Sequence, residues 1–274
     1  MKNLSNLTII LTPVYEDLES LSILINKIDN LYENIFFIIV DDCSVENKIT
    51  LDTLSFGNSS GEIINLEKNL GHQGAICFGL NYINLNYSNY TNIVIMDSDG
   101  EDTPESISLL KKEIESNDIN LVVATRKTRQ NSISFKSFYY LYKIFFYYLV
   151  GYKLDFGNYM IMNRKGLLEL LSVKDLNIHI AGSVIKSEIK YSSLKIDRGQ
   201  RYKGESRMNF FSLVLHGLRA LIVLNALVTR RAFFYIPLLL YGCFFVSNIF
   251  IYILILHCIF YSFLALYKNN LKTN

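Results

Sequence analysis

The sequence predicts an α/β fold, with a mainly parallel sheet flanked by helices, then interfacial helices and a C-terminal transmembrane anchor. Short apolar runs typical of buried strands alternate with helical patterns over residues 7–197, which is the spacing of βαβ units. Acidic residues follow several of the runs directly. The last observation is Ala232–Tyr267, 36 residues without a charged side chain, where a membrane-spanning helix needs only about 20.

The central strand is expected at Ile93–Met96, and it leads directly into acids. On an extended backbone Asp97, Asp99 and Glu101 share one parity, so three carboxylates at a strand end can hold a divalent cation together with phosphate oxygens. A polar turn capping the next helix is the alternative, and Thr103–Pro104 does resemble a helix start. That alternative leaves three crowded acids without a counter-charge, so we favour a metal–phosphate site.

Two earlier strands also end in acids. The run Leu7–Thr12, stopped by Pro13, precedes Tyr15–Asp17, and Ile35–Val40 precedes Asp41–Asp42, with a weaker helix expected from Glu46. Carboxyl ends of neighbouring parallel strands meet in one crevice, where such sheets bind ligands. Neither a Gly-x-Gly-x-x-Gly nor a Walker sequence follows the first strand, which argues against a dinucleotide-dependent oxidoreductase and a P-loop NTPase.

The chain changes character after the sheet. Phe135–Tyr152 contains ten Phe or Tyr residues, which fits either helices at a membrane interface (133–152) or a core helix pair. The loop Asp197–Arg207 carries four cations and is either a solvated loop or a lid whose arginines close over phosphates. A helix with a broad apolar face is expected over Asn209–Leu227.

Charge patterns bound the location and the partners. A net charge of +2 without a basic motif gives no reason to expect nucleic-acid binding. The N-terminal apolar run is too short for a signal peptide, so the body is expected in the cytosol. The apolar tail fits one tilted span, or two short spans that turn near Ser247–Asn248. Cations on both flanks, at Arg230–Arg231 and at Lys268 and Lys272, favour two spans with both ends in the cytosol.

Together these pieces resemble the family 2 glycosyltransferases of the polyprenyl-phosphate type, the group of dolichol-phosphate mannose synthase and the bacterial GtrB-like enzymes. The resemblance covers residues 7 to about 225, and its motifs agree in order and spacing. They are Pro13-Val14-Tyr15-Glu16-Asp17, Asp41-Asp42-Cys43-Ser44, Asn69-Leu70-Gly71-His72-Gln73, Asp97-Ser98-Asp99 with Pro104-Glu105, and Arg201-x-x-Gly204-x-Ser206-Arg207-Met208-Asn209.

The resemblance implies a GT-A (Rossmann-like) fold and inverting transfer of a sugar from a UDP- or GDP-linked donor to a membrane polyprenyl (undecaprenyl or dolichyl) phosphate, for cell-surface glycan synthesis. It implies nucleotide-sugar contacts from Pro13, Tyr15, Asp17, Asp42, Asp97, Ser98 and Asp99, and Mg²⁺ or Mn²⁺ on Asp97, Asp99 and Glu101. The catalytic residues it implies are Asp99, Asp155, Arg126, Arg201 and Arg207.

The implied organisation is a cytosolic catalytic domain at 1–208, a juxtamembrane amphipathic helix at 209–230 and a membrane anchor at 231–268. The protein is therefore expected at the cell (inner or plasma) membrane, where it would contact the bilayer and the lipid acceptor. The resemblance is also compatible with a homo-oligomer.

One departure from the pattern concerns the acceptor. Relatives often read Asp-x-Gly-Asp-Phe-Arg-Leu where this chain has Asp155-Phe156-Gly157-Asn158-Tyr159-Met160-Ile161. The second acid of the pattern is thus replaced by Asn158. A phosphate monoester, whose second pKa is about 6, is already mostly anionic at neutral pH and needs positioning more than deprotonation. The alternatives are a glycosyltransferase that acts on a glycan hydroxyl, which needs a base such as Asp155, and a non-catalytic scaffold that binds nucleotide sugar.

Overall fold

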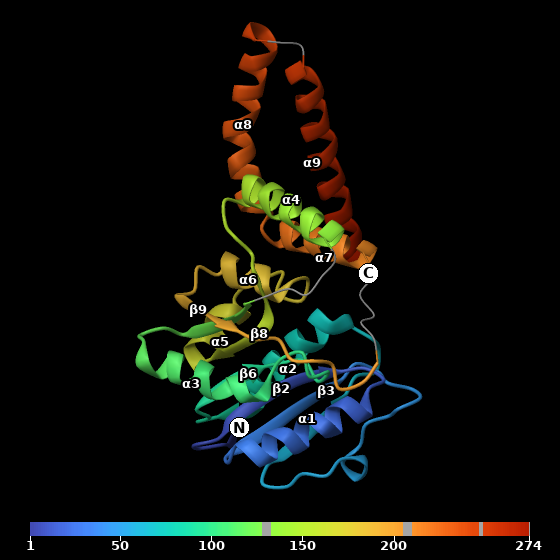
Figure 1. Ribbon diagram of the computed structural model, residues 1–274, viewed down its shortest axis with the longest axis vertical. Helices are drawn as coiled ribbons and strands as arrows, with labels where there is room; N and C mark the ends of the chain where they lie inside the picture. Colours follow the sequence, from blue (N-terminus) through green and yellow to red (C-terminus); the bar gives the residue numbers. More distant parts are fainter. Residues whose placement is uncertain (128–132, 205–209, 247–248, 274) are drawn as a thin grey trace. The chain divides into compact units, whose positions relative to one another are not determined.

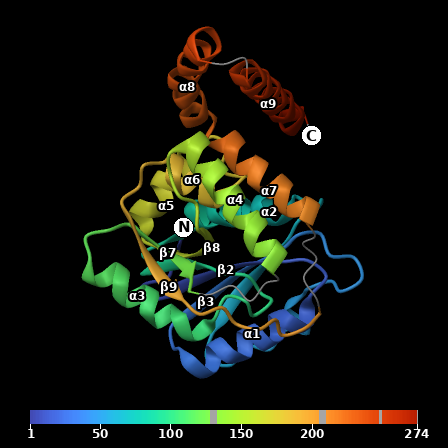
Figure 2. The same cartoon turned by 45° about the horizontal axis from the view of Figure 1, so that its top comes forward.

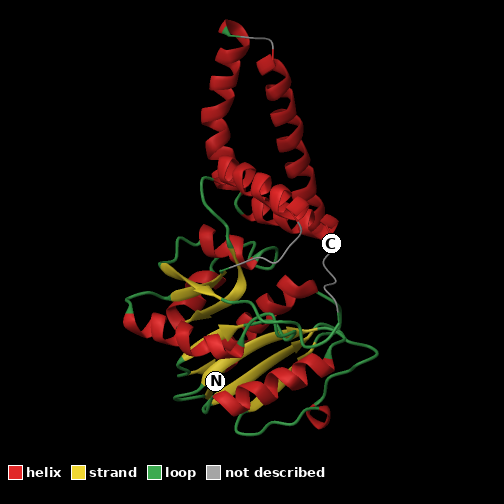
Figure 3. Ribbon diagram, in the orientation of Figure 1, coloured by secondary structure: helices red, strands yellow, loops and turns green. Residues whose placement is uncertain are grey.

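The computed structural model describes residues 1–127, 133–204, 210–246 and 249–273, without the side chains at 133–139, 210–211, 245 and 272–273. The chain divides into two compact units. The sheet unit comprises Met1–Gln130 and Asp155–Arg207, and the helical unit comprises Asn131–Leu154 and Met208–Asn274. Figure 3 shows the strands of the first unit and the helices of the second.

Within the described residues, seven strands form the main sheet of the sheet unit (Figure 1). β8 runs antiparallel to β6 and β7, and every other neighbouring pair is parallel, so the expectation of a mainly parallel sheet is confirmed. The spatial order is β4 (Ser60–Asn65), β3 (Ile35–Asp41), β2 (Thr8–Val14), β6 (Asn92–Ile95), β8 (Phe156–Met162), β7 (Leu121–Arg126) and β9 (Tyr191–Ile196). A small parallel pair joins β1 (Lys2–Asn3) to β5 (Tyr87–Ser88).

Helices cover both faces of the sheet (Figure 2). On one face the apolar stripes of α1 (Leu18–Leu31) and α3 (Ile107–Ser116) pack on alternate strand residues such as Ile10 and Ile39. The opposite face carries α2 (Gly71–Asn86), where Gly79 lies so close to Leu11 and Val40 that an added Cβ would meet a Leu11 methyl at 2.3 Å. The same face carries α5 (Arg164–Leu171) and α6 (Ile180–Lys186). Successive residues of a strand therefore pack against helices on opposite faces of the sheet.

Pro13 lies inside β2, although the sequence predicted that it would end the strand. It pairs with Val40 of β3 on one side. On the other side the pairing with β6 reaches only from Leu11 to Ile95, followed by a hydrogen bond from the Met96 N–H to the Leu11 carbonyl. Pro13 therefore lies where β2 has become an edge, and its missing N–H removes no hydrogen bond from the sheet.

The weak helix expected from Glu46 is wrong. Only a short 3₁₀ turn forms there, at Leu51–Thr53. The N–H groups of Val45, Glu46 and Asn47 bind the Glu16 side chain. The carboxylate of Glu16, from the loop after β2, thus keeps this segment from forming a helix.

The helical unit consists of α4 (Ile133–Val150), α7 (Phe210–Val223), α8 (Asn225–Phe245) and α9 (Ile249–Thr273) in the part of the chain that is described (Figure 1). Over 225–244 and 249–271, α8 and α9 are long and apolar enough to cross a membrane, and few of their residues are buried. The single helix expected over Asn209–Leu227 is divided at Leu224, whose backbone (φ −91°, ψ 17°) leaves the helical region. The suggested turn at Ser247–Asn248 lies outside the described residues.

Aromatic side chains of α4 pack against α8 and α9. Tyr148 stacks on Tyr235 with ring centroids 4.2 Å apart, and its hydroxyl lies 3.2 Å from Nε2 of His257. Arg231 donates to the Tyr148 carbonyl and to the Tyr235 hydroxyl. Tyr140 and Tyr147 on the same helix are exposed. One face of α4 is therefore packed within the helical unit, and the interpretation of this segment as an interfacial helix stays a prediction.

Candidate active site

The candidate site lies where β2, β3 and β6 end side by side. The loop after β2 is locked to the loop after β3 by Glu16, whose carboxylate accepts the N–H groups of Val45 at 2.5 Å, Glu46 at 3.1 Å and Asn47 at 2.8 Å. Glu16 adopts a left-handed backbone (φ 52°) to do so. The Val45 N–H is the largest of the causes that hold the pKa of Glu16 below its usual value.

Buried acids hold the loop after β3. Asp41 accepts hydrogen bonds from the N–H and the hydroxyl of Ser44, at 3.1 and 2.5 Å. Asp42 is 4% exposed, and its Oδ1 accepts the Leu70 N–H at 2.6 Å at the start of α2. Burial raises the pKa of Asp42 despite that hydrogen bond. These contacts fix the loop after β3 and join it to the start of α2.

The acids after β6 lie on a turn, so the acids that lie close together differ from those predicted. The strand ends at Ile95, and Gly100 is left-handed (φ 90°), so the extended parity predicted for 97–101 does not exist. Asp102 instead turns back, and its Oδ2 accepts the N–H of Asp97 at 2.9 Å. Asp97, Asp99 and Asp102 consequently form the acidic cluster, and Glu101 points to arginines. We call these three residues the acid cluster.

His72 at the start of α2 lies beside the acid cluster. Its Nε2 is 3.2 Å from Oδ1 of Asp97 and 3.0 Å from Nδ2 of Asn158 on β8. Burial lowers the pKa of His72, but the charge of Asp97 outweighs it and the net pKa is raised. Sequence reasoning quoted His72 within a motif and gave it no role. The sequence feature that could have indicated a role for His72 is its position directly after Gly71, the first residue of the helix that follows β4.

The segment Asp197–Gly204, here called the strap, lies across the turn. Arg201 donates to Asp99 at 2.8 Å and to Glu101 at 3.0 Å, and Arg198 also pairs with Glu101. Backbone N–H groups of Gly199 and Tyr202 donate to the carbonyls of Glu101 and Asp99. A Cβ on Gly199 would meet the Gly100 carbonyl oxygen at 2.1 Å, so glycine is required for this close approach.

Charge is incompletely balanced within the acid cluster. Burial and the charge of Asp97 raise the pKa of Asp99 to about 6, and burial with Asp97 raises the pKa of Asp102 well above its usual range. Burial also acts to raise the pKa of Asp97, but His72, Arg126 and Arg201 outweigh it, so that pKa is lowered. The Oδ1 atom of Asp97 is buried, and its partner is Nε2 of His72, 3.2 Å away.

This donor set fits a hard divalent cation. Carboxylate oxygens are the ligands such ions take, and a cation would relieve the repulsion that raises the pKa of Asp99. In the described ranges, however, no three side chains of the His, Cys, Asp or Glu type are arranged as a complete coordination set. Glu101, expected as the third ligand, has both carboxylate oxygens on arginines of the strap. Two ligands, Asp97 and Asp99, therefore remain as candidates.

The other predicted nucleotide contacts lie around the same strand ends. Pro13 lies near the end of β2, and Tyr15 is the first residue after that strand, with 44% of its surface exposed. Asp17 caps α1 by accepting the Ser20 N–H, so one of its oxygens already serves the fold. Ser98 is buried in the turn.

The predicted catalytic residues are only partly brought together. Arg126 is the exposed last residue of β7, close enough to lower the pKa of Asp97 electrostatically. Asp155 is exposed immediately before β8, three residues from Asn158. Arg207 lies outside the described residues. Arg201 is therefore the predicted cation that directly contacts the acids, and Arg198 is a second one that sequence reasoning did not single out.

Open α/β sheets bind ligands in the crevice at the carboxyl ends of their strands, and in this chain that edge carries acids and arginines. The chain belongs to glycosyl transferase family 2, whose family model matches residues 9–171. It has the α/β GT-A fold, as expected from the resemblance.

Two curated relatives support this family assignment. One is an uncharacterized glycosyltransferase, YkcC, of Bacillus subtilis (strain 168), 30% identical over 72% of this chain and 62% of the relative. The other is the uncharacterized glycosyltransferase sll0501 of Synechocystis sp., 26% identical over 57% of this chain and 48% of the relative. The chain thus matches less than two thirds of the length of either relative.

Solved structures share the fold. A complex of glucosyl-3-phosphoglycerate synthase from Mycobacterium tuberculosis with Mn²⁺, UDP-glucose and phosphoglyceric acid aligns with a TM-score of 0.55. It is 13% identical, and the alignment covers 82% of this chain and 80% of the synthase. The crystal structure of a mycobacterial protein aligns with a TM-score of 0.57 at 13% identity, over 82% of this chain and 75% of that protein.

Proposed function

We propose that this family 2 glycosyltransferase transfers a sugar, with inversion, from a UDP- or GDP-linked donor to a polyprenyl phosphate in the membrane, for cell-surface glycan synthesis. One observation carries the proposal: the same chain has a family 2 sheet unit and two helices, α8 and α9, that are long and apolar enough to cross a bilayer. A lipid acceptor gives an enzyme of this family a reason to be membrane-bound. The proposed location is the cell membrane, with the sheet unit in the cytosol.

In this proposal the donor occupies the strand ends. Its nucleoside binds between the loops after β2 and β3, which Glu16 and Asp42 hold in place, with Pro13, Tyr15 and Asp17 around it. Asp97, Ser98 and Asp99 meet the diphosphate. Mg²⁺ or Mn²⁺ on Asp97 and Asp99, when bound, would neutralise charge on the leaving diphosphate. Mn²⁺ together with UDP-glucose in the glucosyl-3-phosphoglycerate synthase complex supports this assignment.

The strap supplies the cationic side of the site. Arg201 contacts Asp99 and Glu101 here, and a phosphate offers the same bidentate partner for its guanidinium. We propose that Arg201 moves between carboxylate and phosphate partners and that Arg126 and Arg207 also meet the phosphates, which positions the phosphates and keeps water away from the donor. Glu101 becomes available to the cation when Arg198 and Arg201 leave it.

The acceptor end supports a nucleophile that is already anionic. Asn158, where relatives often have an acid, contacts His72, so this position contributes no carboxylate to accept a proton. A phosphate oxygen at neutral pH needs no base, since its second pKa is about 6. Positioning by cations then replaces proton transfer as the main task of the residues around it.

A second candidate function is transfer to a glycan hydroxyl. It is favoured by Asp155, whose exposed carboxylate before β8 is available as a base. Incubating membranes that contain the protein with radiolabelled UDP- and GDP-sugars separates the two. Transfer to polyprenyl phosphate predicts label in an organic-extractable product that mild acid releases. Label in aqueous glycan alone, dependent on Asp155, would support the second candidate and refute the first.

A further inference from the structure

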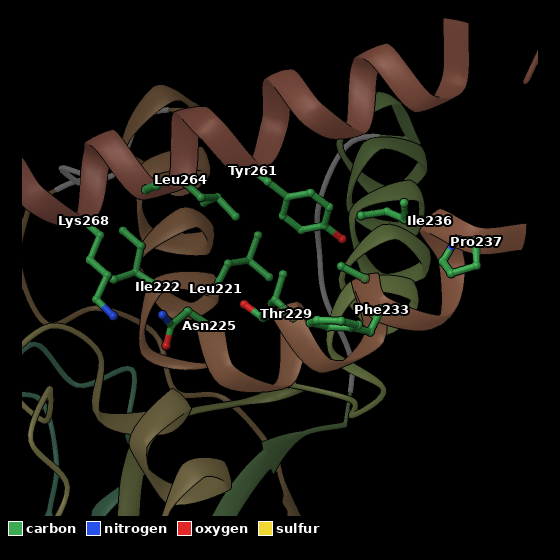
Figure 4. Close-up of a pocket in the computed structure, with 13 residues that line it drawn as sticks. Leu221, Ile222, Asn225, Thr229, Phe233, Ile236, Pro237, Tyr261, Leu264 and Lys268 are labelled. Atoms are coloured by element: carbon green, nitrogen blue, oxygen red, sulfur yellow. The ribbon is translucent and has the colours of Figure 1, made fainter. Parts of the chain in front are cut away.

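The helical unit contains a pocket of about 490 Å³ that the proposed reaction does not use (Figure 4). Residues of α7, α8 and α9 line it, and most of them are aliphatic or aromatic. A volume of this size holds a ligand of small-molecule dimensions or a length of hydrocarbon chain. In a bilayer, the molecules that surround an apolar pocket between such helices are lipids.

The pocket has a polar end and an apolar end. Asn225 and Lys268 lie at one end, and Ile236 and Pro237 lie at the other, with the ring of Tyr261 between them (Figure 4). From Asn225 to Pro237 a helix rises about 18 Å at 1.5 Å per residue, close to half of a hydrocarbon core about 30 Å thick. The pocket therefore extends from the membrane boundary, marked by the start of α8 and the end of α9, through about one leaflet.

Charge at the polar end is sparse and unbalanced. Lys268 is the only charged residue among the described residues that line the pocket, and no ion pair of the described structure includes it. Arg231, nearly two turns into α8, is already engaged by Tyr148 and Tyr235. The hydroxyl of Tyr261 is buried without a hydrogen-bond partner in the described part of the chain. The pocket thus offers one cation, one amide and one unused hydroxyl.

We infer that this pocket binds one acyl chain of an anionic phospholipid, with the phosphodiester held by Lys268 and Asn225. One lysine matches the single negative charge of a phosphodiester such as that of phosphatidylglycerol, whereas a monoester dianion would remain half neutralised. The inference rests on the membrane anchoring in the proposed function, but not on its acceptor. The bound lipid is thus distinct from the polyprenyl phosphate substrate and fixes α7 against the α8–α9 pair.

The absence of tryptophan from the chain provides a direct test. Phe233 lines the pocket, and its neighbour Phe234 does not, although the two side chains are similarly exposed at 77% and 74%. A Phe233→Trp variant of the full chain in nanodiscs carries its only indole at the pocket, and a Phe234→Trp variant reports bulk lipid. Brominated phosphatidylglycerol should quench the first indole about fivefold more effectively than brominated phosphatidylcholine, since one lysine near anionic lipid contributes about that factor. The second indole should show no preference.

Charge variants complete the test. Lys268→Met, which keeps most of the apolar stem, should abolish the preference, while Arg230→Met, a boundary cation outside the pocket lining, should retain it. Native mass spectrometry of the otherwise unaltered protein should show phosphatidylglycerol retained, and lost with Lys268→Met. Equal quenching by both lipids, preferential quenching by a brominated isoprenoid phosphate, or no quenching because a second copy fills the pocket would each overturn the inference. Flotation with liposomes separates these results from a failure of membrane anchoring itself.

Discussion

Nη2 of Arg201 lies 2.8 Å from Oδ2 of Asp99, and the Nε of the same guanidinium lies 3.0 Å from Oε1 of Glu101. A cation from the strap thus occupies carboxylate oxygens that a divalent ion would otherwise take. The strap therefore neutralises part of the negative charge at Asp99 and Glu101, and binding a metal must compete with the strap. This competition links metal affinity, strap position and transfer in a way that substitutions can separate.

Replacing Arg201 should have opposite effects on metal binding and on catalysis. In an Arg201→Gln variant, Asp99 and Glu101 lose their cation, so Mn²⁺ should bind more tightly in the absence of nucleotide. Sugar transfer should fall, on the order of 10²-fold, because the phosphates lose a bidentate partner. Calorimetric Mn²⁺ titration and initial rates measure the two effects. Lys203→Gln, in the same strap but paired with Glu19 at the surface, is the matched control and should change neither.

Removing the charge of Asp99 should abolish most of the activity. Asp99→Asn keeps the size of the side chain and its contact with the Glu101 N–H, but it removes the anion proposed to hold the metal. Since a bound metal ion contributes several kcal/mol, transfer should fall by about 10²-fold or more. An Asp118→Asn variant, at an exposed position in the loop before β7, should be unaffected. Full activity of the Asp99→Asn variant in purified membranes would exclude the proposed metal role.

Glu16 should act on donor binding more than on turnover. Its carboxylate holds the three N–H groups of Val45, Glu46 and Asn47, so Glu16→Ala should loosen one wall of the nucleoside pocket. We expect KM for the donor to rise on the order of tenfold with a smaller change in kcat. Glu16→Gln keeps one acceptor oxygen and should be intermediate. An equal fall in kcat with no change in KM would show that Glu16 has another role.

Glu62, on the edge strand β4, should make the stability of the fold depend on pH. Burial acts to raise the pKa of Glu62, but the hydroxyls of Tyr87 and Tyr82 and the ammonium of Lys2 outweigh it, so the pKa is lowered on folding. The ionised form is therefore favoured in the folded state. Its contribution is present above the unfolded pKa of about 4.3 and is lost as pH falls through the lower folded value.

Glu62→Gln should thus lower Tm at pH 7 by about 2–4 °C, and the difference should shrink near pH 3. Scanning calorimetry of both proteins at the two pH values measures it, with Glu115→Gln on the exposed face of α3 as a control. A difference that grows on acidification would contradict the assignment of the carboxylate as the stabilising form.

Local pattern was sufficient to predict the sheet and the edge of it that carries the site. Apolar runs ending in acids placed Asp42 and Asp97 at strand ends of one crevice, and they follow β3 and β6, the two strands that flank β2. The arginine-rich loop was predicted either as a solvated loop or as a lid, and its Arg201 contacts Asp99. These predictions succeed because strand burial and parallel topology follow from periodicity alone.

The details that failed depend on backbone geometry and on long-range contacts. A left-handed Gly100 turns the acids out of the expected parity, so that Asp102 joins Asp97 and Glu101 meets the strap. The helix expected from Glu46 is prevented by the carboxylate of Glu16, 30 residues earlier. Neither a single φ angle nor such a distant hydrogen bond is visible in residue periodicity.

A defined reconstitution identifies the acceptor of the sugar. The purified full chain in liposomes, with Mn²⁺ and a radiolabelled donor sugar nucleotide, is given polyprenyl phosphate or the same polyprenol without its phosphate. The proposal predicts a mild-acid-labile glycosylated lipid only with the phosphate, lost with Asp99→Asn and retained with Asp155→Asn. Transfer to the polyprenol, or transfer that requires Asp155 and ignores the lipid phosphate, would contradict it.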